Sequence, residues 1–431
     1  MLDVLDRTDR CEKCTICLSQ CPVYRVAGLF PGPKAIGPEE ARLTGAAQPA
    51  PLSATAKDLC LGCRTCSLVC PHDVDPAGLI LADRVKRTAR AGQKPREWLL
   101  GHPALLGEVG TRIPGTNLIL RQKATKLLLR AALGLSEKQP LPTYESRRRT
   151  FARWFARHAA ARKSVIGGNL GKVAYFSGCF TDYNNVGFGE TVVRLFEALG
   201  FEVVRPPQVC CGLPAFANGD EKTARNNGRF NIASLGQAVA EGCEVIVTSP
   251  SCTLMMKHDY QEYLGLPGAG ELAPDIFDAC ELLAFYLEEK RLPPPPGGWR
   301  SVTFAQGAPV LYHEPCHHKS LNIGEPGVAL MNAVLREPVH VLDAGCCGGG
   351  GTYRFKKEKY DVSLDAGKDL FLAVREAGRA ALVASECEAC RMQIEVGAQP
   401  AGTVHPLEIF AAAYLPGYSD SLRRRFLEGS D

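Results

Sequence analysis

Residues 11–22 read CEKCTICLSQCP, and residues 60–71 read CLGCRTCSLVCP. Both stretches have the spacing C-x2-C-x2-C-x3-C-P, which is typical of bacterial ferredoxin-type 4Fe-4S sites, and the fourth cysteine of each run usually ligates the other cluster. We therefore predict two cubane [4Fe-4S] clusters. The first ligand set is Cys11, Cys14, Cys17 and Cys70, and the second is Cys60, Cys63, Cys66 and Cys21. Zinc knuckles are less favoured, because zinc sites normally combine two cysteine pairs.

Length and composition set the general class of the protein. The chain has 431 residues and 19 cysteines, which suggests about three domains with cores that need no disulfides. Met1 to Arg10 is polar, without the apolar run of a secretion signal. We therefore expect a cytoplasmic, reducing location, which favours metal ligation over disulfides. No run reaches the roughly 18 apolar residues that span a bilayer.

The positive charge is concentrated in one segment. Residues 86–163 carry 18 Lys+Arg and 4 Asp+Glu, although the whole chain has a net charge of only +4. One face of a predicted helix in this segment is apolar: Leu120, Ala124, Leu127, Leu128, Ala131 and Leu135. Its basic neighbours are Lys123, Lys126 and Arg130. A second basic helix is predicted from Phe151 to Arg162, with Phe151, Trp154 and Phe155 as apolar anchors.

Two interpretations of these basic helices stay open. They either pack on the protein's own core, or they lie against a membrane surface or face a quinone. Nucleic acid is not an expected partner, because no binding module accompanies the charge.

An internal repeat occupies residues 170–431. In each half, short apolar runs are followed by cysteines, and helical stretches separate the runs. This alternation predicts βαβ units and a parallel sheet in each half, so the fold class is α/β with two Rossmann-like repeats and a helical two-cluster module. The cysteines of the first half are Cys179, Cys210, Cys211 and Cys252, and those of the second are Cys316, Cys346, Cys347, Cys387 and Cys390. All of them follow strands, at the sheet edge where ligands bind.

Each half contains the triplet Cys-Cys-Gly, so we call the halves CCG repeats. Adjacent thiolates can contact two irons, and the glycine allows close approach of the backbone to a cluster. In the first half Ser249 occupies the position of the fifth cysteine, and serine oxygen is a harder, less favoured ligand. That half could therefore hold an iron–sulfur cluster, a zinc ion or nothing.

Other residues near these motifs have weaker signals. Cys243 and Cys280 have no mate in the repeat, and we interpret both as core residues. His313, His317 and His318 surround Cys316, where they could tune a site by hydrogen bonding. No glycine-rich nucleotide fingerprint follows a strand, so no flavin or NAD site is predicted.

Together the motifs resemble the iron–sulfur subunits of the heterodisulfide reductase, glycolate oxidase and anaerobic glycerol-3-phosphate dehydrogenase group. The glycerol-3-phosphate branch is most similar in the stretch from Cys21 to Val26, in Phe30 to Lys34, and in Gly37-Pro38 and Arg42-Leu43. The resemblance implies an electron-transfer subunit on the inner face of the membrane. It also implies an FAD-containing dehydrogenase partner, a membrane quinone of the menaquinone type as electron acceptor, and a noncubane [4Fe-4S] cluster on the five cysteines of the second repeat.

We predict four segments from these patterns. They are a helical two-cluster ferredoxin module at 1–95, a basic amphipathic helical linker at 96–169, and CCG domains at 170–295 and 296–431. The leading hypothesis is an electron-transfer subunit with no catalysis of its own. The alternatives are a heterodisulfide-reductase-like thiol/disulfide catalyst, an iron–sulfur subunit for glycolate, lactate or formate oxidation, and a structural zinc-binding adaptor.

Overall fold

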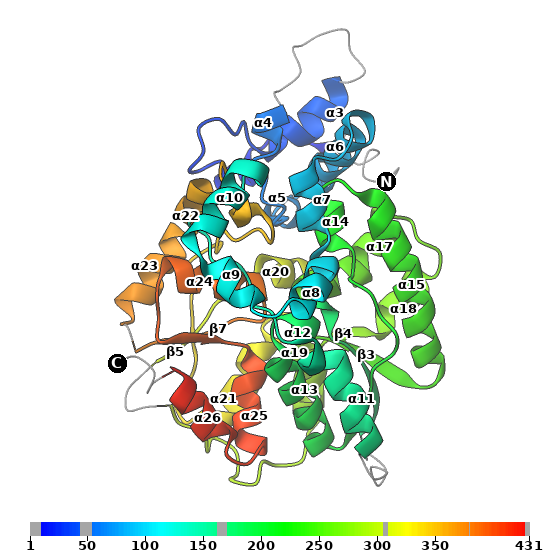
Figure 1. Ribbon diagram of the computed structural model, residues 1–431, viewed down its shortest axis with the longest axis vertical. Coiled ribbons are helices and arrows are strands. Elements are labelled where there is room, and N and C mark those ends of the chain that lie inside the picture. The colour runs from blue at the N-terminus through cyan, green and yellow to red at the C-terminus, as the bar shows by residue number, and fades with distance from the viewer. Residues whose placement is uncertain (1–9, 44–53, 162–169, 305–308, 379, 427–431) are drawn as a thin grey trace.

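Two four-stranded parallel sheets, one from each CCG repeat, lie in the lower half of the molecule among helices (Figure 1). The computed structural model describes residues 10–43, 54–161, 170–304, 309–378 and 380–426. The first sheet has the order β2-β1-β3-β4, with β1 Gly171–Phe176, β2 Phe201–Val204, β3 Cys243–Val247 and β4 Ile276–Asp278. The second has the order β6-β5-β7-β8, with β5 Val310–Tyr312, β6 His340–Val341, β7 Leu382–Ala384 and β8 Gly402–Val404. The predicted α/β class is confirmed, and each sheet gains a fourth strand that the cysteine pattern does not mark.

The central strands are apolar because both faces of each sheet are covered. Val173 pairs with Val203 on one side, and Tyr175 pairs with Ile246 on the other. All four of these side chains are buried. Parallel strands covered by helices on both faces have this nearly continuous apolar composition.

Helices between the sheets join the two repeats into one core. Helix α13 (Val186–Leu199) packs on α25 (Pro406–Tyr414), and α19 (Ala279–Glu288) packs on α21 (Pro326–Val334). One buried cluster contains residues from both sheets and all four helices. The repeats are therefore held in a fixed relation.

The remaining α-helices of the repeats are α12 Gly178–Tyr183, α14 Leu213–Ala217, α15 Glu221–Ala240, α16 Pro250–Leu254, α17 Tyr260–Glu262, α18 Ala269–Leu272, α20 Cys316–Leu321, α22 Tyr360–Ala366, α23 Lys368–Glu376, α24 Glu388–Gly397 and α26 Tyr418–Phe426.

The N-terminal module caps the carboxyl ends of the strands and is helical, as predicted. Its helices are α2 Ile16–Ser19, α3 Glu40–Leu43, α4 Ala54–Lys57, α5 Thr65–Leu68 and α6 Pro76–Ala91. A π-helical turn over Ala35–Glu39 precedes α3. Helix α6 begins where the Asp75 side chain accepts a hydrogen bond from the Gly78 amide, an N-cap that satisfies one free N–H group.

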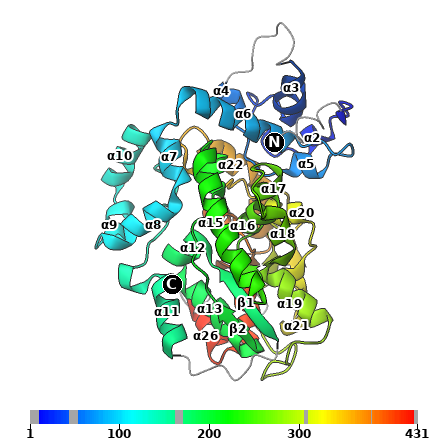
Figure 2. The same ribbon diagram turned by 90° about the vertical axis from the view of Figure 1, so that its right-hand side faces the viewer.

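The basic segment differs from its prediction. It forms α7 Pro95–Gly101, α8 Pro103–Arg112, α9 Thr116–Arg121, α10 Lys123–Leu133 and α11 Phe151–Ala161. The predicted single apolar face is wrong, because Gln122 is extended (ψ 134°) and divides the helix, and Leu135 lies beyond the C-cap Gly134 and is buried. Figure 2 shows α8, α9 and α10 on the side of the molecule opposite α2 and α5.

Helix α11 packs on the core of the first repeat. Phe151 and Phe155 are buried there, and Trp154 packs against the same cluster. Core packing is therefore the correct interpretation of this helix, whose predicted last residue, Arg162, lies outside the described residues. No helix within the described ranges is long and apolar enough to cross a membrane.

Candidate iron–sulfur centres

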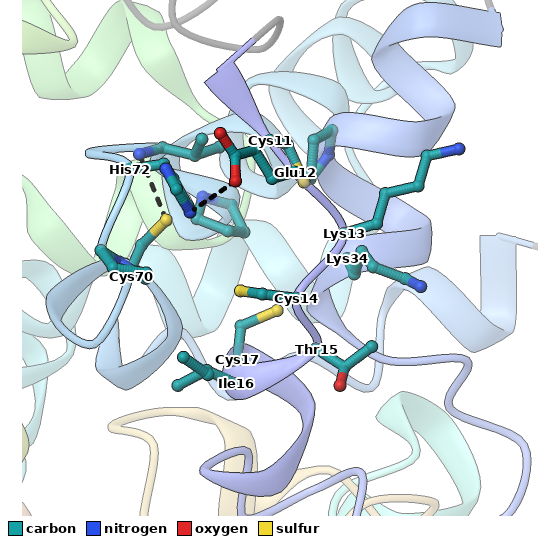
Figure 3. Close-up of a pocket in the computed structure, with 14 residues that line it drawn as sticks. Cys11, Glu12, Lys13, Cys14, Thr15, Ile16, Cys17, Lys34, Cys70 and His72 are labelled. Carbon is teal, nitrogen blue, oxygen red and sulfur yellow. Dashed lines mark hydrogen bonds and ion pairs between the residues drawn. The ribbon is translucent and has the colours of Figure 1, made fainter.

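The first predicted ligand set lies around one pocket at the surface of the N-terminal module. Cys11, Cys14, Cys17 and Cys70 all line it (Figure 3). The Cys14 side chain is exposed, and the Cys70 sulfur accepts a hydrogen bond from the Val74 amide at 3.4 Å. Burial, followed by the charge of the other three cysteines, raises the pKa of Cys17. The structure therefore brings together the four cysteines that the spacing predicted.

A left-handed turn shapes both cysteine loops in the same way. Thr15 follows Cys14 with φ +68°, and Arg64 follows Cys63 with φ +62°. Such conformations are uncommon outside glycine, and their matched positions show that the two runs fold alike. The turn lets three cysteines of a short run face one point.

The second set is more deeply enclosed. Cys21, Cys60, Cys63 and Cys66 line a second pocket. Burial raises the pKa of Cys21 to about 12. Burial, followed by the charges of neighbouring cysteines, also raises the pKa of Cys66. Because metal ligation requires the thiolate, a bound metal would have to displace these protons.

The second CCG repeat gathers its cysteines at the ends of β5, β6 and β7. The sulfurs of Cys347 and Cys390 lie 3.0 Å apart, and the Gly348 amide donates to the Cys346 sulfur at 3.3 Å. His313 is the unexpected member, since one of its ring nitrogens and the sulfurs of Cys347 and Cys390 all lie within 4.8 Å of one another. The sequence marks His313 only as a neighbour of Cys316, whereas the fold places it beside two other cysteines.

The glycine of each CCG triplet is required by its surroundings. Gly212 has φ +90°, and a Cβ there would lie 3.0 Å from the Cα of Ala224. Gly348 has φ +74°, and a Cβ there would lie 1.9 Å from the carbonyl oxygen of Ser363. Both the left-handed backbone and the close approach exclude a side chain.

The first CCG repeat gathers Cys179, Cys210, Cys211 and Cys252 in the same way. Ser249, at the position of the missing fifth cysteine, donates a hydrogen bond to the Glu388 carboxylate of the second repeat, with Oγ 3.2 and 3.1 Å from its two oxygens. The spacing of the cysteines gives no sign of this contact across the repeats.

Three sets of cysteines meet at one cavity of about 260 Å³. Its lining includes the nine CCG-repeat cysteines together with Cys60 and Cys63 of the second loop. Burial, followed by the charge of Cys63, raises the pKa of Cys316, which also reflects how near the two sets lie. The second ferredoxin-type loop therefore opens onto the same space as both repeats.

Two contacts attach that loop to the repeats. Arg64 forms an ion pair with the buried Asp259 of the first repeat at 2.5 Å. His317 of the second repeat lies 3.1 Å from the Gly62 carbonyl oxygen and 3.0 Å from the Ser251 hydroxyl. Sequence reasoning missed Arg64, because an arginine inside a cysteine loop has no distinctive spacing.

The remaining predicted residues fall outside the cavity. Cys243 and Cys280 are buried in apolar clusters, which confirms both as core residues. His318 is also fully buried, and its ring faces the Glu314 carboxylate at 3.9 Å. Carboxylates overcome the effect of burial and raise the pKa of His318 to about 9.

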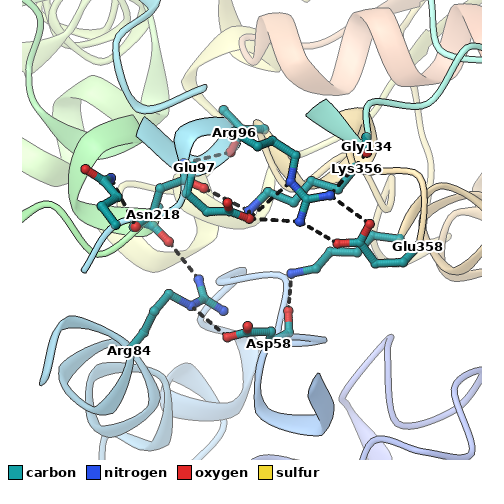
Figure 4. A network of polar contacts seen from close by, with 12 residues as sticks. Asp58, Arg84, Arg96, Glu97, Gly134, Asn218, Lys356 and Glu358 are labelled. Carbon is teal, nitrogen blue, oxygen red and sulfur yellow. Dashed lines mark hydrogen bonds and ion pairs between the residues drawn. The ribbon is translucent and has the colours of Figure 1, made fainter. Parts of the chain in front are cut away.

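A polar network joins the N-terminal module to both repeats (Figure 4). Arg96 forms ion pairs with Glu97 at 2.9 Å and with Glu358 at 2.7 Å. Lys356 donates to the Asn218 side chain at 2.8 Å. Arg84 donates to the Cys60 carbonyl at 3.3 Å, which connects the network to the second cysteine loop.

Comparisons with known proteins agree with this arrangement. A model described as a 4Fe-4S dicluster domain matches residues 7–74, and a cysteine-rich domain model matches residues 173–257 and 310–395. One subunit of the anaerobic glycerol-3-phosphate dehydrogenase of Escherichia coli K12 is 34% identical over 416 residues, which cover 94% of this chain and 98% of that protein. The chain belongs to the family of this dehydrogenase subunit. The predicted resemblance is thereby confirmed, and this is an iron–sulfur protein of the CCG-domain group.

More distant relatives belong to other oxidoreductases. One subunit of the fumarate reductase (CoM/CoB) of Methanothermobacter marburgensis is 24% identical, over 94% of this chain and 72% of that protein. A probable glycolate oxidase iron-sulfur subunit of Bacillus subtilis is 23% identical, over 91% of this chain and 89% of that protein. These relatives are subunits of dehydrogenase, oxidase or reductase systems.

Proposed function

We propose that this protein is the electron-transfer subunit of a glycerol-3-phosphate-type dehydrogenase, between an FAD-containing subunit and membrane menaquinone. The observation that carries the proposal is the continuity of the cysteine sets, from the exposed Cys14 through the second loop to the shared cavity. Iron–sulfur clusters bound to these sets would accept and release single electrons. The chain's own part is to hold the sets close together and to enclose the other sets more deeply than the first.

The donor sets fit the groups that we assign to them. Four thiols around each of two pockets suit two cubane clusters, with the ligand sets predicted above. The five cysteines of the second repeat are proposed to hold a noncubane [4Fe-4S] cluster, and the four of the first repeat a metal centre, either iron–sulfur or zinc. The segment limits at 95, 169 and 295 also stay a proposal.

A membrane surface is the proposed partner of helices α8 to α10. Leu118 is 70% exposed and Leu128 is 67% exposed, and Leu105, Val109, Ile113, Ile119 and Leu127 are exposed as well. Lys123 and Arg130 lie exposed beside this apolar surface. Apolar side chains flanked by basic ones favour the interface of an anionic membrane. This supports a peripheral location on the inner face of the cell membrane.

The exposed side of the first ligand set is the proposed contact for the FAD-containing subunit. Ile16 and Leu68 are exposed on the adjacent helices α2 and α5. This side lies away from α8 to α10 in Figure 2, so the two partners would not compete for one surface.

Substitution of Cys14 tests the proposed function. In a complex with a glycerol-3-phosphate-oxidising flavoprotein, Cys14→Ser should lose about four irons per chain and most of the glycerol-3-phosphate-dependent reduction of menadione. Circular dichroism should show that the α/β region stays folded, and the core variant Cys243→Ala should keep its iron. The chain alone should contain iron and sulfide but oxidise no glycerol 3-phosphate. Oxidation without the flavoprotein, or unchanged iron and quinone reduction in Cys14→Ser, would contradict the proposal.

A second candidate function is thiol/disulfide chemistry in the shared cavity. It is favoured by the position of both CCG cysteine sets around one space of about 260 Å³. Cleavage of a disulfide to two thiols consumes two electrons and two protons. The chain reduced with dithionite and freed of excess reductant should then release thiol from a small organic disulfide in proportion to the electrons it loses. Unchanged reduced protein after mixing would reject this candidate.

The alternative of an iron–sulfur subunit for glycolate, lactate or formate oxidation is distinguished from the proposed function by the flavoprotein that co-purifies with the chain.

A further inference from the structure

The two CCG repeats differ at one cysteine position. In the first repeat, the residue at this position contacts a side chain of the second repeat. Ser249 corresponds to Cys387 in the repeat, and Pro250 corresponds to Glu388. The first repeat thus lacks a thiol where the second has one, and the second has a carboxylate where the first has none. The Ser249 hydroxyl donates to that carboxylate.

The position of Glu388 favours a role in the first repeat. It is the first residue of α24, between Cys387 and Cys390 in sequence, yet its carboxylate contacts Ser249. It also lies within electrostatic range of Cys179 and lines the cavity with the other cysteines of the first repeat. The packing of α13 and α19 on α25 and α21 holds the repeats in this relation.

We infer that Glu388 supplies an oxygen ligand to the metal centre of the first repeat, in place of its missing fifth cysteine. A carboxylate binds zinc or iron more strongly than a serine hydroxyl does, and ligating carboxylates commonly accept a further hydrogen bond, which Ser249 provides here. The first centre is then assembled from both repeats. The inference rests on the proposal that Cys179, Cys210, Cys211 and Cys252 bind metal.

Four variants of the full chain separate a ligand from a hydrogen-bonded link. Cys179→Ser identifies the metal of the first repeat as the metal that is lost. Glu388→Gln keeps an acceptor for the Ser249 hydroxyl but removes the charged ligand, whereas Ser249→Ala removes the hydrogen bond and keeps the ligand. Glu395→Gln is the matched control, because Glu395 lies on the same helix and also accepts from a hydroxyl, that of Thr403, at 2.6 Å.

The measurement is metal per chain after anaerobic purification, and its retention against a chelator. Glu388→Gln should retain the metal identified with Cys179→Ser at least about a hundredfold less well than the parent. Ser249→Ala loses only the outer hydrogen bond and should retain it about tenfold less well, while Glu395→Gln should stay within about twofold. In the double variant Ser249→Cys/Glu388→Gln the metal should return with all-sulfur ligation. Zinc-edge X-ray absorption or 57Fe Mössbauer spectra would reveal that change of ligand.

Each failure has a distinct meaning. Equal retention in Glu388→Gln and Glu395→Gln would overturn the role of Glu388 and leave the cysteine site intact. Equal loss in Ser249→Ala and Glu388→Gln would make the pair a structural link between repeats. If Cys179→Ser lost no metal, the first repeat would hold none, and both the site and the inference would fall.

Discussion

Among single residues, Gly348 fixes the position of the adjacent cysteines Cys346 and Cys347. Its amide donates to the Cys346 sulfur, its carbonyl accepts from the Ser363 hydroxyl at 2.7 Å, and its Cα approaches the Ser363 backbone too closely for any side chain. The glycine of the motif therefore serves packing between the cysteine loop and α22 as well as access to a cluster.

Gly348→Ala should consequently lose iron from the second repeat and destabilise the fold by about 3 kcal/mol, from left-handed strain plus steric overlap. Gly351→Ala is the control. It shares the left-handed backbone, with φ +57°, but a Cβ there meets nothing within 4 Å, so only about 1 kcal/mol is expected. Anaerobic thermal unfolding and iron analysis measure both. Equal effects of the two substitutions would show that the contact with Ser363 does not matter.

The spacing of cysteines along the chain predicts well which residues form a ligand set, but it predicts contacts between distant segments poorly. The two ferredoxin-type runs identified both cysteine sets that the fold brings together, because short loops determine which side chains can meet. Glu388 and His313 were not predicted at their observed positions. Their contacts depend on how strands and repeats pack, which no spacing in the sequence records.

Helices α9 and α10 expose several large apolar side chains: Leu118, Ile119, Leu127 and Leu128. The helical wheel placed Leu127 and Leu128 on one face, and both are exposed. It failed at Gln122, because a break without proline or glycine carries no strong signal in the sequence. It also failed at Leu135, because the wheel was continued past Gly134, the left-handed residue that ends α10. It could not separate α10 from the equally amphipathic α11, since burial depends on the neighbouring core.

Replacing Lys123, Lys126 and Arg130 by Gln should weaken binding to anionic vesicles by up to about a hundredfold, since each basic residue near such a surface contributes about 1 kcal/mol. Added salt should reproduce the change. Arg147, Arg148 and Arg149 provide the matched control, because they are exposed, carry the same charge and lie in a separate short helix. Vesicle co-sedimentation measures the binding. Equal loss of vesicle binding in both triple variants would show that binding depends on the overall positive charge and not on the surface of α8 to α10.

In the molecule as a whole, the polar network of Figure 4 connects the N-terminal module to both repeats. Lys356 is only 7% exposed within it, and burial lowers the pKa of its ammonium group from 10.5 to about 8. In the unfolded chain this lysine keeps its proton up to the higher value. Between pH 8 and 10.5 the unfolded state therefore holds more protons, and stability at this site rises with pH.

We expect the free energy of unfolding of the parent to increase by up to about 3 kcal/mol, relative to that of Lys356→Met, as the pH rises from about 8 to 10.5. A constant offset between the two proteins is also expected, because the variant loses the bond to Asn218. The exposed neighbour Lys357 supplies the control variant Lys357→Met, which should follow the parent at every pH. Anaerobic denaturant unfolding across this range measures the difference. A difference that does not vary with pH would show that Lys356 stays charged in the fold.

Several iron–sulfur clusters on one chain are the basis of the proposed function, and metal analysis tests for them most directly. Iron, acid-labile sulfide and zinc should be measured per chain on anaerobically purified protein, with low-temperature EPR on the same sample. We expect at least about twelve irons, from two cubanes and the centre of the second repeat. About eight irons would leave the second repeat without its cluster, and colourless protein without iron would contradict the proposed electron-transfer function as a whole.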